Sequence, residues 1–142
     1  MPYCPYKCHY CDFNAYRLPP RPGALAAMAD AIAREIALGP GADAGRRVSS
    51  IYFGGGTPSL FPPDRIAALI DLVRRRYEVR RGAEVTLECN PGTVDLGSLR
   101  ALRRAGVTRL SLGAQSFSQE TLRRLGRGHS PDDTRRAVQL AR

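Results

Sequence analysis

Apolar residues recur along most of the chain at the spacing of amphipathic helices, three or four positions apart. The first such stretch begins at Leu25 and ends at Gly39, a residue type that commonly closes a helix. A later stretch follows Ser130, whose side chain suits a helix N-cap, with Pro131 in the first helical position. In all, the pattern predicts helices over 25–39, 64–77, 95–105, 118–125 and 131–142.

Three short apolar runs lie between these helices and have the length of buried strands, namely 48–53, 84–89 and 107–112. Short strands that alternate with amphipathic helices predict right-handed βαβ units and therefore a parallel sheet. The predicted fold class is α/β, either a doubly wound sheet or part of a (β/α) barrel. A loop is expected from Gly39 to Gly45.

The composition is that of one ordinary globular domain: 142 residues, of which 43% are hydrophobic and 25% charged. Charged residues interrupt every apolar stretch before the ~18 residues that a membrane helix needs. The sequence does not open with a signal peptide. We therefore expect a cytoplasmic protein without a membrane span.

The net charge of +9 raises the question of a polyanionic partner. The arginines, however, are scattered in pairs on the polar sides of predicted helices, and no aromatic residues interleave with them. An overall preference for arginine explains this pattern as well. We do not expect a nucleic-acid partner.

The cysteines are distributed unevenly. Cys4, Cys8 and Cys11 fall within eight residues, in a loop with no predicted strand ahead of it. Cys89 stands alone in a predicted strand and is expected to be a core residue. In a chain without a secretory signal, such a cluster indicates a metal or redox site more than a disulfide framework.

Three thiolates are one ligand short of a closed zinc or iron–sulfur site. A [4Fe–4S] cluster held by three cysteines would leave one iron open to a further ligand, and this is the first hypothesis. The alternatives are reactive thiols and a zinc site completed by His9 or Cys89. His9 directly follows Cys8, where it is badly placed to complete the same tetrahedron.

A glycine-rich string, Gly-Gly-Gly-Thr-Pro-Ser over 54–59, directly follows a predicted strand. Glycines leave backbone amides and carbonyls open to a polar ligand. The string is not a Walker loop, because no Gly-Lys-Ser/Thr follows it. It is not a dinucleotide fingerprint either, because Ser59 stands in place of the third glycine. Taken alone, it favours a tight turn between strand and helix.

Polar residues also end the other two predicted strands. Glu88 lies at the end of 84–89, and Gln115 follows 107–112. In parallel β/α architectures, ligands bind beyond the carboxyl ends of the strands. The cysteine loop, the glycine string, Glu88 and Gln115 are therefore expected to open on one face.

These motifs together carry a resemblance to a known family. The Cys-x-x-x-Cys-x-x-Cys spacing, with Tyr10 before the third cysteine, resembles the cluster motif of radical S-adenosylmethionine (SAM) proteins. The longer series resembles the group formed by the oxygen-independent coproporphyrinogen III oxidases and the related HemW-like haem chaperones, and it comprises 4–13, 54–59, 88–91, 110–117 and 125–129.

The resemblance implies two cofactors. Cys4, Cys8 and Cys11 would bind three irons of a [4Fe–4S] cluster, and SAM would bind the fourth iron. Reduction through the cluster would cleave SAM to a radical that abstracts hydrogen from a substrate. The residues implied to contact SAM are Tyr10 at the adenine, Gly55, Gly56 and Thr57 at the methionine end, Glu88 and Gln115 at polar groups, and Arg127 at the carboxylate.

Within the group, Asp12 and Phe13 after the third cysteine match the HemW-like branch, since the oxidases have Gly-Cys there. The branch implies a haem or porphyrin ligand, an electron donor and a haem-acceptor protein. Oxidation of coproporphyrinogen, by an oxidoreductase, is the alternative. A small zinc-binding module with a basic surface is a distant one.

The resemblance also implies a domain organisation. Residues 1–142 would be an incomplete radical SAM core, about half of a TIM-type (β/α) barrel, with the cluster loop at about 3–14 and βα units at about 22–142. A C-terminal substrate or haem domain would lie outside this chain. His129, at a predicted helix boundary, is expected to be structural.

Overall fold

The computed structural model describes residues 1–18, 21–39 and 47–142. The loop expected from Gly39 to Gly45 therefore lies outside the described residues, apart from Gly39. In chain order the elements are β1 (Tyr3–Cys4), β2 (Tyr16–Arg17), α1 (Ala24–Leu38), β3 (Arg47–Phe53), the 3₁₀ helix η2 (Pro58–Leu60), α2 (Pro63–Arg76), β4 (Glu78–Cys89), α3 (Leu96–Ala105), β5 (Arg109–Leu112), α4 (Gln119–Arg124) and α5 (Pro131–Ala141).

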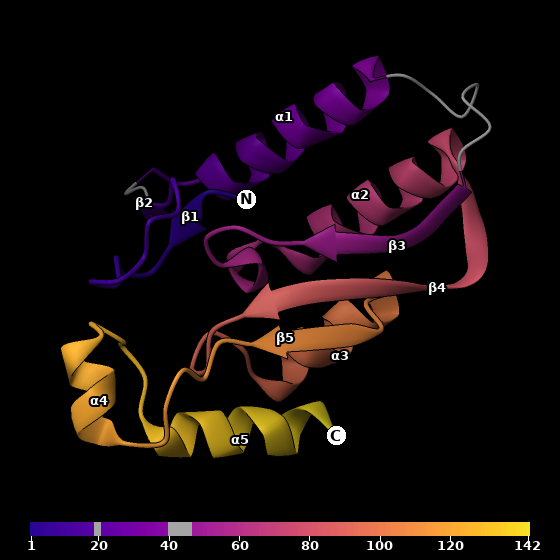
Figure 1. Ribbon diagram of the computed structural model, residues 1–142. Coiled ribbons are helices and arrows are strands. Elements are labelled where there is room, and N and C mark those ends of the chain that lie inside the picture. Colours follow the sequence, from indigo (N-terminus) through magenta and orange to yellow (C-terminus); the bar gives the residue numbers. More distant parts are fainter. Residues whose placement is uncertain (19–20, 40–46) are drawn as a thin grey trace.

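Strands β3, β4 and β5 form one parallel sheet in that order, and α2 and α3 make the crossover connections. Parallel neighbours cannot be joined by a tight hairpin, so each crossover returns the chain to the same end of the sheet. Figure 1 shows the three arrowheads pointing the same way, toward β1, β2 and α4. The predicted α/β class with a parallel sheet is confirmed.

All five predicted helices are present in the described ranges, with ends about one residue from those expected. Ser130 caps α5, because its hydroxyl accepts from the backbone N–H of Asp133 while the Asp133 carboxylate accepts from the N–H of Ser130. Asp95 and Ser98 form the same reciprocal pair at α3. In the part of the chain that the structure describes, no helix is long and apolar enough to cross a membrane.

Two strand boundaries differ from the prediction. β4 begins at Glu78 rather than at residue 84, because its first residues pair with the start of β3 before the register shifts to Ser50 opposite Glu84. Two arginines and Gly82 (φ +76°) give this segment the composition of a turn. β5 begins at Arg109, and Val107 is buried just ahead of the strand.

Two short strands that the sequence pattern does not predict support the cysteine loop. Cys4 lies in β1, which pairs in parallel with β2 on the far side of the loop. Tyr3 pairs with Tyr16 and Cys4 with Arg17, so the two ends of the loop are held together. Strands of two residues carry no periodicity, and the sequence pattern therefore gives no sign of them.

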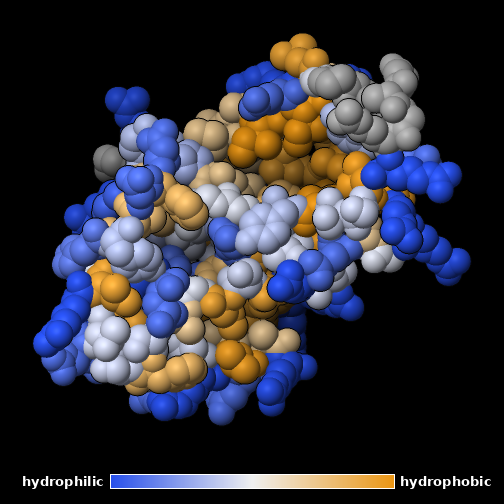
Figure 2. Space-filling model, viewed as in Figure 1, coloured by the Kyte–Doolittle hydropathy of each residue, from blue (hydrophilic) through white to orange (hydrophobic). Residues whose placement is uncertain are grey.

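The two faces of the sheet have different chemistry. Residues that pair across parallel strands share a face, and Phe53 with Leu87 and Cys89 with Leu112 lie on the apolar one. Apolar atoms gather chiefly between α1 and β3 in the view of Figure 2. Helices α1, α2 and α3 and two loop residues complete the core, whose buried members are Ala29, Phe53, Phe61, Ile66, Leu69, Ile70, Val85, Leu87, Cys89, Leu102 and Val107.

Candidate functional site

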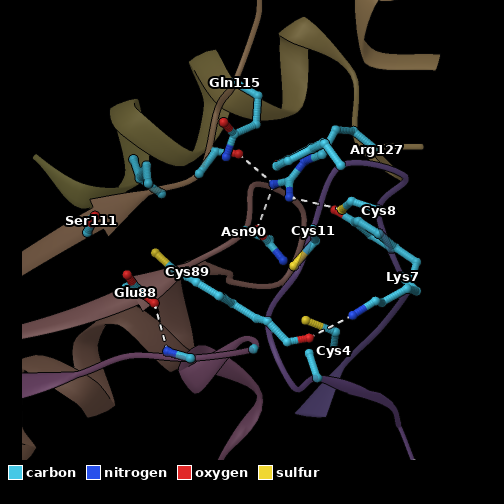
Figure 3. Close-up of a pocket in the computed structure, with 18 residues that line it drawn as sticks. Cys4, Lys7, Cys8, Cys11, Glu88, Cys89, Asn90, Ser111, Gln115 and Arg127 are labelled. Carbon is cyan, nitrogen blue, oxygen red and sulfur yellow. Dashed lines mark hydrogen bonds between the residues drawn. The ribbon is translucent and has the colours of Figure 1, made fainter. Parts of the chain in front are cut away.

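The carboxyl ends of the three parallel strands border a cavity of about 370 Å³. The cysteine loop and the segment between α4 and α5 close its other sides (Figure 3). Of the ten site residues expected from the sequence, nine line this cavity, namely Cys4, Cys8, Tyr10, Cys11, Gly55, Gly56, Glu88, Gln115 and Arg127. The expected convergence on one face is therefore present in the fold.

The three cysteines lie on one side of the cavity, and Glu88 and Ser111 on the other (Figure 3). All three thiols are free; Cys8 is buried, and Cys4 and Cys11 are half-buried. The loop is closed on itself by the Lys7 ammonium, which donates to the Phe13 carbonyl at 2.7 Å. The thiols therefore belong to a short loop with internal support.

His9 points away from the thiols. Its Nδ1 atom donates to the carbonyl of Arg124 at 3.0 Å, and its backbone N–H donates to Leu125 at 3.1 Å. These bonds join the cysteine loop to the end of α4. In the described ranges, no three His, Cys, Asp or Glu side chains converge on one ion position. A cluster does not require such convergence, because each thiolate binds a different iron.

The glycine string touches the first residues of the chain so closely that side chains are excluded. A Cβ on Gly55, which has φ +116°, would lie 2.7 Å from the Met1 carbonyl oxygen, and one on Gly56 would lie 2.5 Å from that of Tyr3. The N–H groups of Gly56 and Thr57 donate to Met1 and Tyr3 at 2.7 and 2.8 Å. Glycine is therefore needed for this contact, and both residues also line the cavity.

Thr57 is the one expected site residue that does not line the cavity. Its side chain is 1% exposed and lies behind the thiols, with Oγ1 at 3.3 Å from the Cys4 sulfur. The side-chain amide of Asn90 donates to the same Oγ1 at 2.8 Å. The Thr57 hydroxyl is therefore engaged by protein groups alone.

Glu88 lies on the polar face of β4 with both carboxylate oxygens bonded. One oxygen accepts the N–H of Gly55 at 3.0 Å, and the other accepts the Tyr52 hydroxyl at 2.5 Å. The bond to Glu88 raises the pKa of Tyr52 above its ordinary value, because the neighbouring carboxylate disfavours a phenolate. The carboxylate is thus oriented at the cavity wall before any ligand binds.

Arg127 extends from the α4–α5 segment into the cavity. Its Nη2 donates to the Gly113 carbonyl at 2.5 Å and to the Asn90 side-chain oxygen at 2.6 Å, and its Nη1 lies 3.4 Å from the Cys8 sulfur. The guanidinium also lies over the Tyr6 ring, 5.6 Å from its centroid. A fixed positive charge therefore borders the thiols.

Gln115 has φ +62°, a left-handed conformation that non-glycine residues adopt at a cost. The strained turn follows β5 directly and lies at the rim of the cavity. Tyr10, half-exposed at the same cavity, has a pKa raised by partial burial. Both residues line the cavity.

Two contributors were missed from the sequence. Tyr52 has the place of an ordinary strand aromatic, and Asn90 that of a turn residue before Pro91. The usable signal is the position of each residue relative to Glu88. Tyr52 pairs with Thr86, which lies two positions before Glu88 in β4, and Asn90 lies two positions after Glu88. Neither position shows its partners without the tertiary structure.

The two residues expected to be structural are buried. Cys89 is 3% exposed in the core, and burial raises the pKa of its thiol to about 12. His129 is also 3% exposed and donates from Nε2 to the Ala114 carbonyl at 3.1 Å. Burial lowers the pKa of this imidazole, because desolvation disfavours the charged form.

The fold and the cavity define a class: a β/α protein with a thiol-lined cavity at the carboxyl ends of its parallel strands. The family described as "Radical SAM superfamily" matches residues 1–142. The chain belongs to the radical SAM superfamily, which implies a [4Fe–4S] cluster and SAM as cofactors.

The chain is 42% identical over 144 residues to "Heme chaperone HemW" of Escherichia coli (strain K12). The match covers 99% of this chain and 37% of that protein. It is 42% identical over 132 residues to "Radical S-adenosyl methionine domain-containing protein 1, mitochondrial" of Bos taurus, covering 93% of this chain and 29% of the relative. The resemblance inferred from the motifs is confirmed.

Among solved structures, the chain matches one described as "Coproporphyrinogen III oxidase (HemN) from Escherichia coli is a Radical SAM enzyme". The match has a TM-score of 0.85 at 29% identity and covers 99% of this chain and 32% of that one. The prediction of a partial (β/α) barrel is confirmed by this likeness.

The buried thiol gives a first testable prediction. Because the pKa of Cys89 is raised to about 12, this thiol stays protonated and enclosed at pH 8. We expect iodoacetamide to alkylate the half-buried Cys4 and Cys11 of the folded, metal-free chain well before Cys89. Peptide mass spectrometry with and without denaturant measures this order. Equal labelling of Cys89 and Cys11 in the folded chain would contradict it.

Proposed function

We propose that this chain is the cluster- and SAM-binding part of a HemW-like haem chaperone. One observation carries the proposal: three free thiols, a side-chain-free glycine wall, an oriented carboxylate and a guanidinium border the same cavity. The thiols complement an iron–sulfur cluster, and the carboxylate, the guanidinium and the glycine backbone complement a zwitterionic amino-acid ligand. The matched relatives named HemW support the same assignment.

Cys4, Cys8 and Cys11 are the proposed ligands of the [4Fe–4S] cluster. They are reduced, they share a loop that is tied down at both ends, and Arg127 places a positive charge beside Cys8. A positive charge offsets part of the negative charge that thiolates and cluster bring into a half-enclosed site. The donor set therefore fits the group that the family implies.

The proposed SAM contacts follow from the same cavity wall. Glu88 would accept a hydrogen bond from the amino group of SAM. Gly55 and Gly56 would lie along the methionine part of SAM, because both glycines line the same cavity. Arg127 would donate to the carboxylate. Gln115 and Tyr10 would contact the remaining polar and adenine portions from the cavity rim. Thr57 supports the thiols from behind.

When bound together, cluster and SAM supply one-electron chemistry to the protein. The contribution of the chain is to hold and orient both groups. The Lys7–Phe13 bond and the β1–β2 pairing keep the thiol loop closed, and the bonds of His9 keep it against α4. These contacts hold the cysteine loop at the mouth of the cavity, where it can position both groups.

The names of the matched relatives support haem as a ligand. The chain spans about 37% of the length of the E. coli HemW that it matches, so haem binding is proposed for the whole protein. A haem-acceptor protein and an electron donor are proposed as its partners. Within the chain, we propose the cluster loop at about 3–14 and the βα units at about 22–142.

Anaerobic reconstitution with iron and sulfide tests the cluster. We expect about four irons and four sulfides per chain, with the absorption and EPR spectra of a [4Fe–4S] cluster. Cys8→Ala should lose most of the cluster, because one iron loses its thiolate. Cys89→Ala is the matched control and should retain it, since Cys89 borders the same cavity but its thiol is buried in the core. One zinc per chain, or an intact cluster in Cys8→Ala, would refute the assignment.

Calorimetric titration with SAM tests the carboxylate. Glu88→Ala in the reconstituted protein should weaken SAM binding by about tenfold or more, because a charge-assisted hydrogen bond is lost. Glu84→Ala is the control: Glu84 lies on the same face of β4 but bonds to Thr86 and Arg109. Its substitution should leave the affinity unchanged. Equal losses in both variants would argue against a specific contact.

The structural match to the coproporphyrinogen oxidase makes oxidation of coproporphyrinogen the second candidate. The two functions separate on the full-length protein. A HemW-like chaperone should bind haem and should produce no protoporphyrinogen when given coproporphyrinogen, SAM and a reductant. Porphyrin formation coupled to SAM consumption, followed by chromatography, would instead establish the oxidase.

A further inference from the structure

Two of the three clustered thiols are joined by a chain of side-chain hydrogen bonds. It runs from the Cys4 sulfur to Thr57 Oγ1 (3.3 Å), from Thr57 to the Asn90 amide (2.8 Å), from Asn90 to Arg127 (2.6 Å), and from Arg127 to the Cys8 sulfur (3.4 Å). The three linking side chains come from three different loops: those after β3, after β4, and between α4 and α5.

The donors in this chain have defined directions. Arginine has no acceptor, so the oxygen of the Asn90 amide must face Arg127 and its nitrogen must face Thr57. The Thr57 oxygen accepts from that nitrogen, and its own hydrogen is donated to the Cys4 sulfur once that sulfur is a thiolate, because a thiolate can only accept. Asn90 therefore orients a donor toward each of the two thiols, in opposite directions.

The bridge is enclosed and tightly fitted. Asn90 is 8% exposed and Thr57 1%, so protein groups rather than bulk water must satisfy the amide. Gly113 leaves the space that the bridge needs, because a Cβ there would lie 3.0 Å from the Asn90 oxygen and 3.2 Å from Arg127 Nη2. The turn after β4 holds Asn90 through a 2.7 Å bond from the Thr93 hydroxyl to its carbonyl.

We propose that Asn90 is a positioning residue that sets the hydrogen bonding of the cluster thiolates, with Thr57 and Arg127 as the groups through which it acts. The inference rests on the proposed function, since it takes Cys4 and Cys8 to be cluster ligands. The proposed role belongs to the side-chain amide of Asn90 and not to its backbone. A turn residue alone needs no side-chain amide directed at both Thr57 and Arg127.

The expected consequence is electrostatic. Hydrogen bonds and positive charge at ligating sulfurs stabilise the more negative, reduced state of an iron–sulfur cluster and so raise its reduction potential. Without Asn90, Arg127 keeps its bond to Gly113 but loses one of its acceptors, and the Thr57 hydroxyl is free to turn from Cys4. The potential should then fall.

The test is a redox titration of the reconstituted chain, with the reduced cluster followed by EPR. At a fixed potential near the wild-type midpoint, Asn90→Ala should lower the ratio of reduced to oxidised cluster by roughly threefold or more. Thr93→Ala is the matched control, because it removes a hydrogen bond from the same turn without touching the amide. It should leave the ratio unchanged.

Thr57→Val provides a second variant of nearly unchanged shape, in case Asn90→Ala does not fold. It should shift the ratio in the same direction, and the double substitution should shift it by less than the sum of the two, because both act on Cys4 through one hydroxyl. Additive shifts would overturn the proposed route.

The remaining outcomes separate this inference from the proposed function. An intact cluster with an unchanged potential in Asn90→Ala and in Thr57→Val overturns the inference alone. Equal shifts in Asn90→Ala and Thr93→Ala also overturn it, since the turn and not the amide would then be responsible. A wild-type chain that assembles no cluster on Cys4 and Cys8 overturns both.

Discussion

The site depends on a backbone contact between the start of the chain and the glycine string. Main-chain bonds from Gly56 and Thr57 reach residues 1 and 3, and the space of a Cβ on either Gly55 or Gly56 is already filled by that segment. This contact places β1, and with it Cys4, over the carboxyl ends of the parallel strands. The rest of the cysteine loop then extends across the cavity and is held at its far side by the bonds of His9.

The two faces of the sheet carry different side chains, apolar on one and polar on the other, and the polar face contributes side chains to the site. The helices bury one face, on which Cys89 becomes an inert core thiol with a pKa raised to about 12. The other face carries Glu88 toward the cavity and holds it with Tyr52 and the glycine string. Adjacent residues of one strand thus face different surroundings: Cys89 faces the core and Glu88 faces the cavity.

The local elements were predictable because each depends on its own residues. Amphipathic spacing and the Ser130 cap located the helices to about one residue, and short apolar runs located the strands. The cysteine spacing, the glycine string and Glu88 identified the candidate site, since few chemistries need these residue types in this order. The early start of β4 was missed because a register shift accommodates arginines and a glycine that resemble a turn.

The sequence by itself determined the parallel α/β class, the cysteine and glycine motifs and the edge of the sheet at which they meet, because periodicity and spacing are local properties. Only the tertiary structure decided that β1 and β2 pair across the cysteine loop and that Thr57 lies behind the thiols. It alone joined Asn90 to Arg127 across thirty-seven positions of sequence. Such contacts depend on how loops from separate βα units meet, and no local pattern encodes that geometry.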